Sequence, residues 1–205
     1  MKKVFFILSV VLSAIAHAEE VEVLSNDTVP FVYESRVKNP ISNEMIADIL
    51  VPEYHNARDE FSKRELFAKI DPDVKNSMAE AKAKSNYSVR VNVDLGQYDF
   101  DNKRFPSGFT SATFIPFSYN FSMLYALLFD NVKEIEFIPI PLDVAKTLSE
   151  KLQRSRTITA VVYCRITGTD IRKLQYEKSK VLLSHITKVD FLSDGDSLIA
   201  TVTPK

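Results

Sequence analysis

Hydrophobic and polar residues alternate with two different periods along this chain, and the period changes near Asn86. From Val89 to Leu95 apolar and polar residues alternate strictly, which is the pattern of a half-buried β-strand. Ahead of Asn86, apolar residues recur at three- and four-residue spacing, which is typical of amphipathic helices. We therefore expect an α+β protein, in which an N-terminal helical segment precedes a mainly antiparallel β unit.

The first part of the chain is expected to be extended. Residues 19–41 alternate weakly and contain Pro30 and Pro40, so they are interpreted as an extended arm. Phe31 to Tyr33 is the one stretch of this arm that favours a short strand.

Residues 42–85 are expected to form the helical segment. Ser42 is a suitable N-cap for a helix from Asn43 towards Leu50, and Pro52 breaks or restarts that helix. Two further helices are predicted: Ser62 and Glu65 have the spacing of a capping box, and Asp71-Pro72 combines a cap with a first-turn proline.

Residues 86–205 are expected to form the β unit. Strands are predicted at 89–95, 109–117, 135–138, 157–167, 180–191 and 198–202, with a crossover helix from Pro141 to Arg154. Residues 119–130 are predicted to be a short helix or a buried loop, and residues 168–178 a polar connection. This order matches an OB-like five-stranded barrel, and a sandwich would give the same order, so both remain open.

The first eighteen residues have the organisation of a signal peptide. Lys2 and Lys3 precede an uncharged apolar run from Val4 to Ala16, and Ala16 and Ala18 fit a small-x-small cleavage site. We expect cleavage after Ala18 and a periplasmic or secreted product. No later run is long and apolar enough to predict a transmembrane segment in the mature chain.

The net charge and the single cysteine bear on the partners of this protein and on its disulfides. Removing Lys2 and Lys3 leaves 24 basic residues against 27 acidic ones, a net charge of −3, which argues against a nucleic-acid partner. Cys164 is the single cysteine, so no intramolecular disulfide is possible. It shares a predicted strand face with Val162 and Ile166, so we expect a buried, unreactive thiol.

The most distinctive local sequence runs from Leu95 to Phe105. Its aromatic residues stand beside charged ones, which favours a binding groove for a sugar or a peptide; the same residues also suit an apolar plug at a barrel end. The candidate ligand-binding residues are Tyr98, Asp99, Phe100, Asp101, Arg104 and Phe105. The spacing of Asp99, Asp101 and Asn102 is loosely that of a calcium loop, but the glycine and distal glutamate of such loops are absent from the sequence.

Catalytic patterns are weak in this sequence. His55 and His185 lack a serine or cysteine context that marks a triad, and no paired spacing predicts a zinc site, so no metal or other cofactor is expected. Glu134 and Glu136 would share one strand face, which permits a carboxylate pair and also suits a solvated edge.

The C-terminal half is locally basic. Arg154, Arg156 and Arg165 are candidates for contact with a polyanionic surface, although a solvated sheet face is the simpler explanation.

Residues 59–105, with Asp59-Glu60-Phe61 and the run Leu95-Gly96-Gln97-Tyr98-Asp99-Phe100 followed by Phe105, resemble exported bacterial proteins grouped as a domain of unknown function. The resemblance implies a bacterial origin and an exported location, and it implies no activity. Together with the absence of a catalytic set in the sequence, this favours a non-enzymatic binding or envelope interaction module. A carboxylate-dependent hydrolase acting through Asp99 and Asp101 and a structural subunit of an envelope assembly remain the alternatives.

Overall fold

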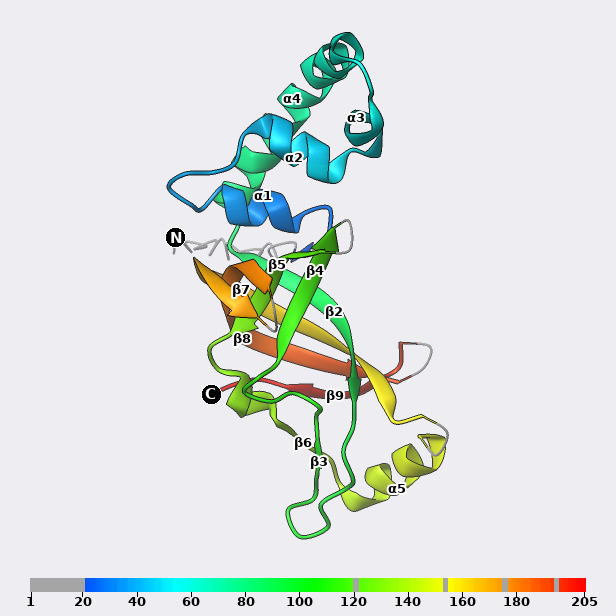
Figure 1. Ribbon diagram of the computed structural model, residues 1–205. Coiled ribbons are helices and arrows are strands. Elements are labelled where there is room, and N and C mark those ends of the chain that lie inside the picture. Colours follow the sequence, from blue (N-terminus) through cyan, green and yellow to red (C-terminus); the bar gives the residue numbers. More distant parts are fainter. Residues whose placement is uncertain (1–20, 120–121, 153–154, 175–176, 194–195) are drawn as a thin grey trace, which may run out of the picture.

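The computed structural model describes residues 21–119, 122–152, 155–174, 177–193 and 196–205. The fold is mixed α+β: helices stand at one end of a curled, mainly β sheet, and a small unit with one helix stands at the opposite end (Figure 1). The predicted signal peptide with Ala16 and Ala18 lies outside the described residues, as does Arg154. Within the described ranges, no helix is long and apolar enough to cross a membrane.

The first helix replaces the strand predicted at Phe31 to Tyr33, so that prediction was wrong. After the short strand β1 (Glu22–Val23), helix α1 (Val29–Glu34) begins with Pro30 in its first turn, where a missing N–H costs nothing. Only α1 and β1 are regular elements in the part of the predicted extended arm that the structure describes.

Helix α2 (Asn43–Leu50) confirms the predicted helix and its cap, because Ser42 Oγ accepts a hydrogen bond from Met45 N at 3.2 Å. Helix α3 (Pro52–Asn56) begins at the proline predicted to break or restart the helix.

Helix α4 (Glu60–Ala83) is one continuous helix, so the two separate helices predicted for this region were wrong. Its N-cap is Asp59, whose Oδ1 accepts from Ser62 N at 2.8 Å; Ser62 therefore lies inside the helix. Pro72 is also inside the helix. Asp71 does not cap a new helix, because its carboxylate accepts from Asn43 Nδ2 at 2.7 Å and pairs with Lys75 Nζ at 2.6 Å, one turn ahead.

The main sheet has seven strands in the order β1-β2-β7-β8-β5-β4, and β9 pairs with β8. These strands are β2 (Asn86–Asp94), β4 (Phe114–Tyr119), β5 (Ser122–Phe129), β7 (Thr157–Leu174), β8 (Glu177–Leu192) and β9 (Leu198–Val202). All pairs are antiparallel except β1 with β2 and β5 with β8, which are parallel. The predicted strands at 89–95, 180–191 and 198–202 are thereby confirmed within one to three residues.

Three segments of the sheet differ from the prediction. Strand β4 begins at Phe114, five residues after the predicted start of the strand at 109–117. Residues 122–129 form β5 and neither a helix nor a loop; Tyr125, Ala126 and Leu127 are consecutive and all buried, as expected for a strand covered on both faces. Residues 168–174 continue β7 and do not form a polar connection, because the ladder to β8 runs as far as Leu174 opposite Glu177.

The crossover helix is present but does not connect strands of one sheet. Helix α5 (Leu142–Lys151) has Pro141 as its N-cap. The strand before it, β6 (Phe137–Pro139), pairs with β3 (Arg104–Pro106) in a separate two-stranded sheet, and the 3₁₀ helix η1 (Val132–Ile135) precedes it. The main sheet is not a five-stranded barrel, since its path begins at β1 and β2 and ends at β4.

Cys164 lies on the buried face of β7, as its strand position predicted. The predicted inward set is buried throughout: Ile158, Ala160, Val162, Cys164 and Ile166. Burial raises the pKa of the Cys164 thiol to about 12, and a hydrogen bond with Ser184 opposes that rise only in part.

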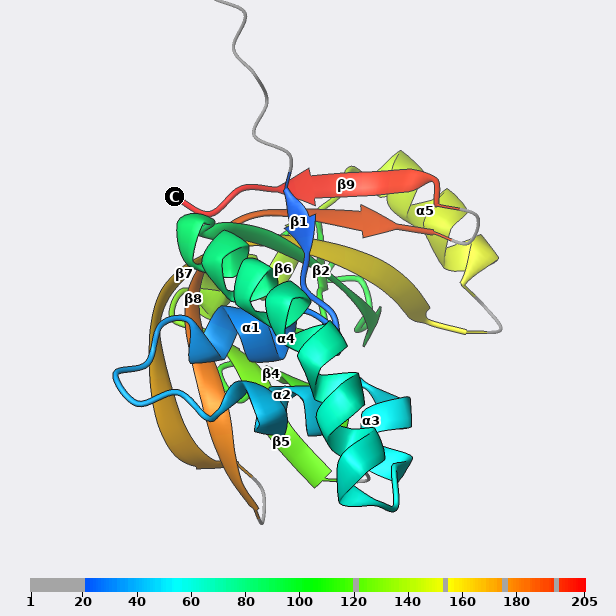
Figure 2. The ribbon, with the colours of Figure 1, turned by 90° about the horizontal axis from the view of Figure 1, so that it is seen from above.

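Helix α1 is fixed to the sheet through Glu34, a carboxylate that is 1% exposed. Its Oε1 accepts from Tyr125 Oη at 2.9 Å and pairs with Lys180 Nζ at 2.5 Å, while Oε2 accepts from Ile41 N at 3.0 Å. Burial and the neighbouring Glu34 raise the pKa of Tyr125, so its hydroxyl stays a donor. The buried charge is thus satisfied from three directions, and α1 is held where the sheet curls (Figure 2).

Candidate functional site

The carboxylate of Asp99 stabilises the loop between β2 and β3. Asp99 N donates to Arg104 O at 2.8 Å, and Arg104 N donates to Asp99 O at 3.2 Å, which makes residues 99–104 a tight loop. Asp99 Oδ1 accepts from the N–H groups of Asp101 and Asn102, and Oδ2 accepts from Asn102 Nδ2 at 2.7 Å. The hydrogen bonds from Asn102 hold the pKa of Asp99 below its usual range, so this carboxylate is an ionised structural group.

Arg104 completes the loop without facing the aromatic side chains of Tyr98 and Phe100. Its Nε is buried and lies 3.5 Å from Asp99 Oδ2, a distance that makes an ion pair and no good hydrogen bond. The guanidinium carbon lies 3.7 Å from the ring centre of Phe137 on β6, a cation–π contact.

Three aromatic rings pack in a graded series from core to surface. Phe105 is fully buried, and its ring centre lies 4.8 Å from that of half-buried Tyr98. Phe100 meets Tyr98 edge-on at 5.2 Å and is 73% exposed. The exposed ring of Phe100 is therefore held in place by Tyr98, which in turn packs on buried Phe105.

Helix α5 forms the opposite wall. Ala145, Leu148 and Leu152 are buried and hold the helix on the core, whereas Leu142 is 53% exposed. Val144 on the same helix is 44% exposed. The apolar stripe of α5 therefore extends beyond what the core covers.

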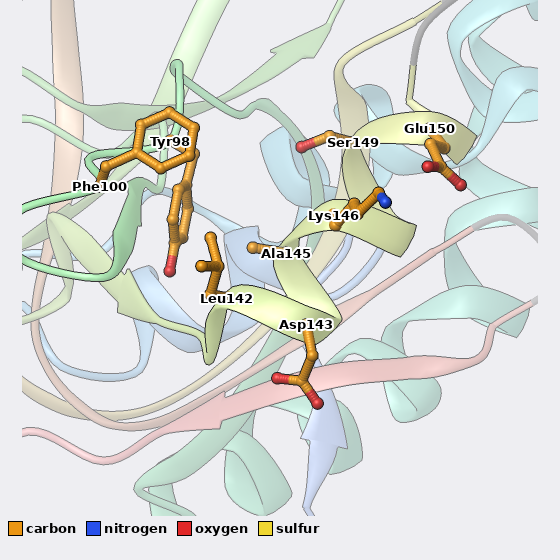
Figure 3. A pocket seen from close by; sticks show the side chains of 8 residues that line it. All are labelled: Tyr98, Phe100, Leu142, Asp143, Ala145, Lys146, Ser149 and Glu150. Atoms are coloured by element: carbon orange, nitrogen blue, oxygen red, sulfur yellow. The ribbon is translucent and has the colours of Figure 1, made fainter.

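The two walls enclose what we call the aromatic groove, with a volume of about 750 Å³. Its lining consists of Tyr98, Phe100, Leu142, Asp143, Ala145, Lys146, Ser149 and Glu150. Figure 3 shows the two rings on one side facing Leu142, Ala145 and Ser149 of α5 on the other.

Hydrogen bonds to main-chain carbonyl groups tie the walls of the groove together. Tyr98 Oη donates to Ile140 O at 2.8 Å, and Ile140 N donates to Lys103 O at 3.1 Å, just ahead of α5. The pairing of β3 with β6 adds a second connection between the same two chain segments. The groove is thus formed in the unliganded chain.

The structure separates the six candidate residues predicted from the sequence. Tyr98 and Phe100 line the aromatic groove, and Phe105 packs beneath them. Asp99, Asp101 and Arg104 belong to the loop and are not among the lining residues. Sequence reasoning missed the α5 wall, although an exposed leucine directly after Pro141 was a usable signal.

The other chemical candidates are dispersed. Arg156 Nε donates to Leu95 O at 2.7 Å and its guanidinium also contacts Gly96 O, so this side chain fixes the start of the loop. Arg165 is exposed on β7. Glu134 lies in η1 and not on a strand, which corrects the proposed strand-face pair with Glu136.

The histidines are held in local pairs. His185 Nδ1 lies 2.8 Å from Asp130, and His55 Nδ1 lies 3.3 Å from Asp48. In the part of the chain that the structure describes, no group of three or more His, Cys, Asp or Glu residues is placed to bind a metal ion.

Fold and site together define an α+β protein with an exposed aromatic groove at the end of a curled sheet. Residues 48–151 match the sequence model of a family described as "Domain of unknown function (DUF4852)", and the chain belongs to this family. The matched range contains every residue that lines the aromatic groove. No curated protein matches the chain. No solved structure matches it either.

Proposed function

We propose that this protein is an exported, non-enzymatic binding module whose aromatic groove takes up an apolar group of a partner protein. The observation that carries the proposal is the exposure of Phe100 and Leu142 on facing walls of a preformed groove. Clustered exposed apolar side chains with polar residues at the rim are typical of interaction sites. A volume of about 750 Å³ lies within the usual range for ligand pockets.

The carboxylates near the groove support binding better than hydrolysis. Asp99 is ionised and engaged in its own loop, so it is a poor general acid. Asp143 and Glu150 are seven residues apart on α5, or about 10 Å along the helix axis at ~1.5 Å per residue, so they stand at different places along the groove. Figure 3 also shows Asp143 directed away from the two rings.

The groove favours an occupant with an apolar centre and a polar edge. Tyr98, Phe100, Leu142 and Ala145 supply the apolar surface, and Lys146 and Ser149 stand at the rim on the α5 side. Tyr98 cannot supply a free donor, since its hydroxyl already donates to Ile140 O. One or two apolar side chains of a partner, with an acceptor near Lys146, fit this arrangement.

Export rests on the sequence of the first eighteen residues, and we propose a periplasmic or secreted location. Mass spectrometry of the intact protein recovered outside the cytoplasm should give a chain that begins at Glu19. A chain that retains Met1 to Ala18 would contradict the proposed export.

The binding function is tested by affinity purification from the exporting cell with two matched variants. Phe100→Ser removes the exposed ring of the groove, and Phe61→Ser removes an 84% exposed ring on α4, at the far end of the molecule. A partner of the groove is retained by the wild type and by Phe61→Ser and lost with Phe100→Ser. Loss with both variants or with neither contradicts the assignment. A partner retained in fixed stoichiometry through all three would instead indicate a structural subunit.

A further inference from the structure

A second concave site lies where the main sheet fails to close. The sheet begins with β1 and β2 and ends with β4, and β2 and β4 are not paired with each other in the sheet order. Between them lies a cavity of about 400 Å³, lined by residues 91–94 of β2, by Gly108 and Phe109, and by residues 113–116 at the start of β4. We call this cavity the strand slot.

The main chain of β2 presents hydrogen-bonding groups to the strand slot. Leu95 N donates to Arg156 O at 3.0 Å, which continues the antiparallel register with β7. Because hydrogen-bonded positions alternate in such a pair, odd-numbered residues of β2 bond to β7 and even-numbered ones point to the opposite edge. Ser88 confirms the alternation, since its carbonyl accepts from Leu24 N at 2.7 Å on that edge. The main-chain N–H and C=O of Asn92, which lines the slot, therefore point to this edge, and those of Arg90, two residues before it, point to the same edge.

Strand β4 is short and contains a proline. Pro116 has no N–H, so β4 lacks one main-chain donor at its centre. At one end, the Tyr119 hydroxyl bonds to Asn26 O and bridges β4 to the segment after β1. At the other end, Gly108 lies so close to β2 that a Cβ there would be 2.8 Å from Asp94 O. The slot is consequently closed at both ends and open along its length.

The slot has the size and surface of a place for one extended chain. From Arg90 to Asp94 there are four residue steps, or about 13 Å at ~3.3 Å per residue. Val91 and Val93 are half-buried on the inner face, beside buried Ile115. An entering strand would thus carry apolar side chains on one face and polar ones on the other.

We propose that the strand slot binds an extended segment of a partner protein, which adds to β2 as a strand and bonds to the main chain of Arg90 and Asn92. The chain itself already uses this edge in the same manner, because β1 pairs with Tyr87 and Ser88 immediately before the slot. Strand addition of this kind takes its affinity from main-chain hydrogen bonds and its specificity from alternate side chains. A slot closed at both ends admits a single extended chain more readily than the edge of another folded sheet. The site is distinct from the aromatic groove and does not depend on its function.

The test uses the full-length mature chain and a capped heptapeptide of sequence KTVTVTK as the probe. We expect saturable NMR shifts at the amides of Arg90 and Asn92, with exchange of both amide hydrogens slowed at least tenfold. The same peptide with its three central nitrogens methylated keeps its side chains but loses main-chain donors, and should bind at least tenfold more weakly. Equal binding of both peptides, or no shift at these two amides at millimolar peptide, overturns the proposal.

Two variants of one residue provide the matched protein control. Asn92→Pro removes the N–H that faces the slot and leaves the ladder to β7 intact, so binding should fall at least tenfold. Asn92→Ala removes the side chain and keeps that N–H, so binding should be retained. If Asn92→Pro does not fold, the methylated peptide still decides. A protein that sediments as a dimer and excludes the peptide would show that a second copy fills the slot, which also overturns the proposal.

Discussion

Replacing Lys180 with methionine tests whether the buried carboxylate of Glu34 anchors α1 to the sheet. The substitution keeps most of the apolar length of the side chain but removes the ammonium that lies 2.5 Å from Glu34 Oε1. Glu34 is 1% exposed, and among the described residues Tyr125 and the Ile41 amide would remain as its partners. Breaking a buried ion pair in this way costs about 3–5 kcal/mol, because a charge is left without its counter-charge.

One feature of the site lowers that figure. The Lys180 side chain is 30% exposed, so water already screens part of its attraction. We therefore expect Lys180→Met to lower the free energy of unfolding by about 2–3.5 kcal/mol at pH 7.

Urea denaturation followed by circular dichroism at pH 7 measures the difference between wild type and variant. Lys178→Met, an exposed lysine on the same strand, is the matched control and should cost less than about 0.5 kcal/mol. A loss below about 1 kcal/mol for Lys180→Met, or an equal loss for both variants, would refute the anchor.

Three further expectations follow from single sites. Cys164 should react with a thiol reagent only in denaturant, since the residue is 1% exposed and burial raises the pKa of its thiol to about 12. Rapid labelling of the native protein would contradict the position of Cys164 on the buried face of β7. Gly108→Ala should cost about 1–3 kcal/mol in urea denaturation, because φ is +84° and the new Cβ meets a backbone oxygen of β2. At Gly168 a new Cβ would lie 3.7 Å from Leu183 Cδ1, an ordinary van der Waals contact, so Gly168→Ala should be nearly neutral; equal effects of the two substitutions would contradict the account. The pKa of Asp99 is lowered, so its contribution to stability is present above about pH 4 and is lost as the pH falls through the lowered value. Asp99→Asn should therefore be less stable than the wild type at pH 7 and equally stable in acid. Thermal unfolding of both proteins at pH 7 and in acid measures this.

Local patterns in the sequence were sufficient where one segment determines its own structure. The alternation from Val89 to Leu95 predicted β2 and its buried face, and Ser42 predicted where α2 begins. The strand face of Cys164 was likewise predicted correctly, because every second residue around it is apolar and buried. In each case the deciding contacts lie within a few residues of one another.

Elements determined by distant partners were missed. β5 looked like a helix or a loop because its continuous apolar run lacks alternation, and only burial on both faces makes it a strand. The length of β7 depends on its ladder with β8, which the polar residues from Gly168 onward conceal. Pro72 falsely indicated a helix boundary, because local propensity took no account of the contact between Asp71 and α2.

Only one of the two walls of the aromatic groove could be predicted from the sequence. Tyr98 and Phe100 stood out as an unusual aromatic cluster, but their partners on α5 lie more than forty residues away in the chain. Pairing of β3 with β6 brings the two walls together, and neither three-residue strand has a pattern long enough to be recognised in the sequence.

The most direct test of the proposed function is photo-crosslinking from position 100 in the cell that produces the protein. A benzophenone-bearing phenylalanine analogue replaces Phe100, which is 73% exposed, in one variant and Phe61, which is 84% exposed, in another. We expect a discrete crosslinked product from position 100, none from position 61, and loss of the product when Leu142→Ser is added on the opposite wall. No product from position 100, or the same products from both positions, would contradict a binding function for the aromatic groove.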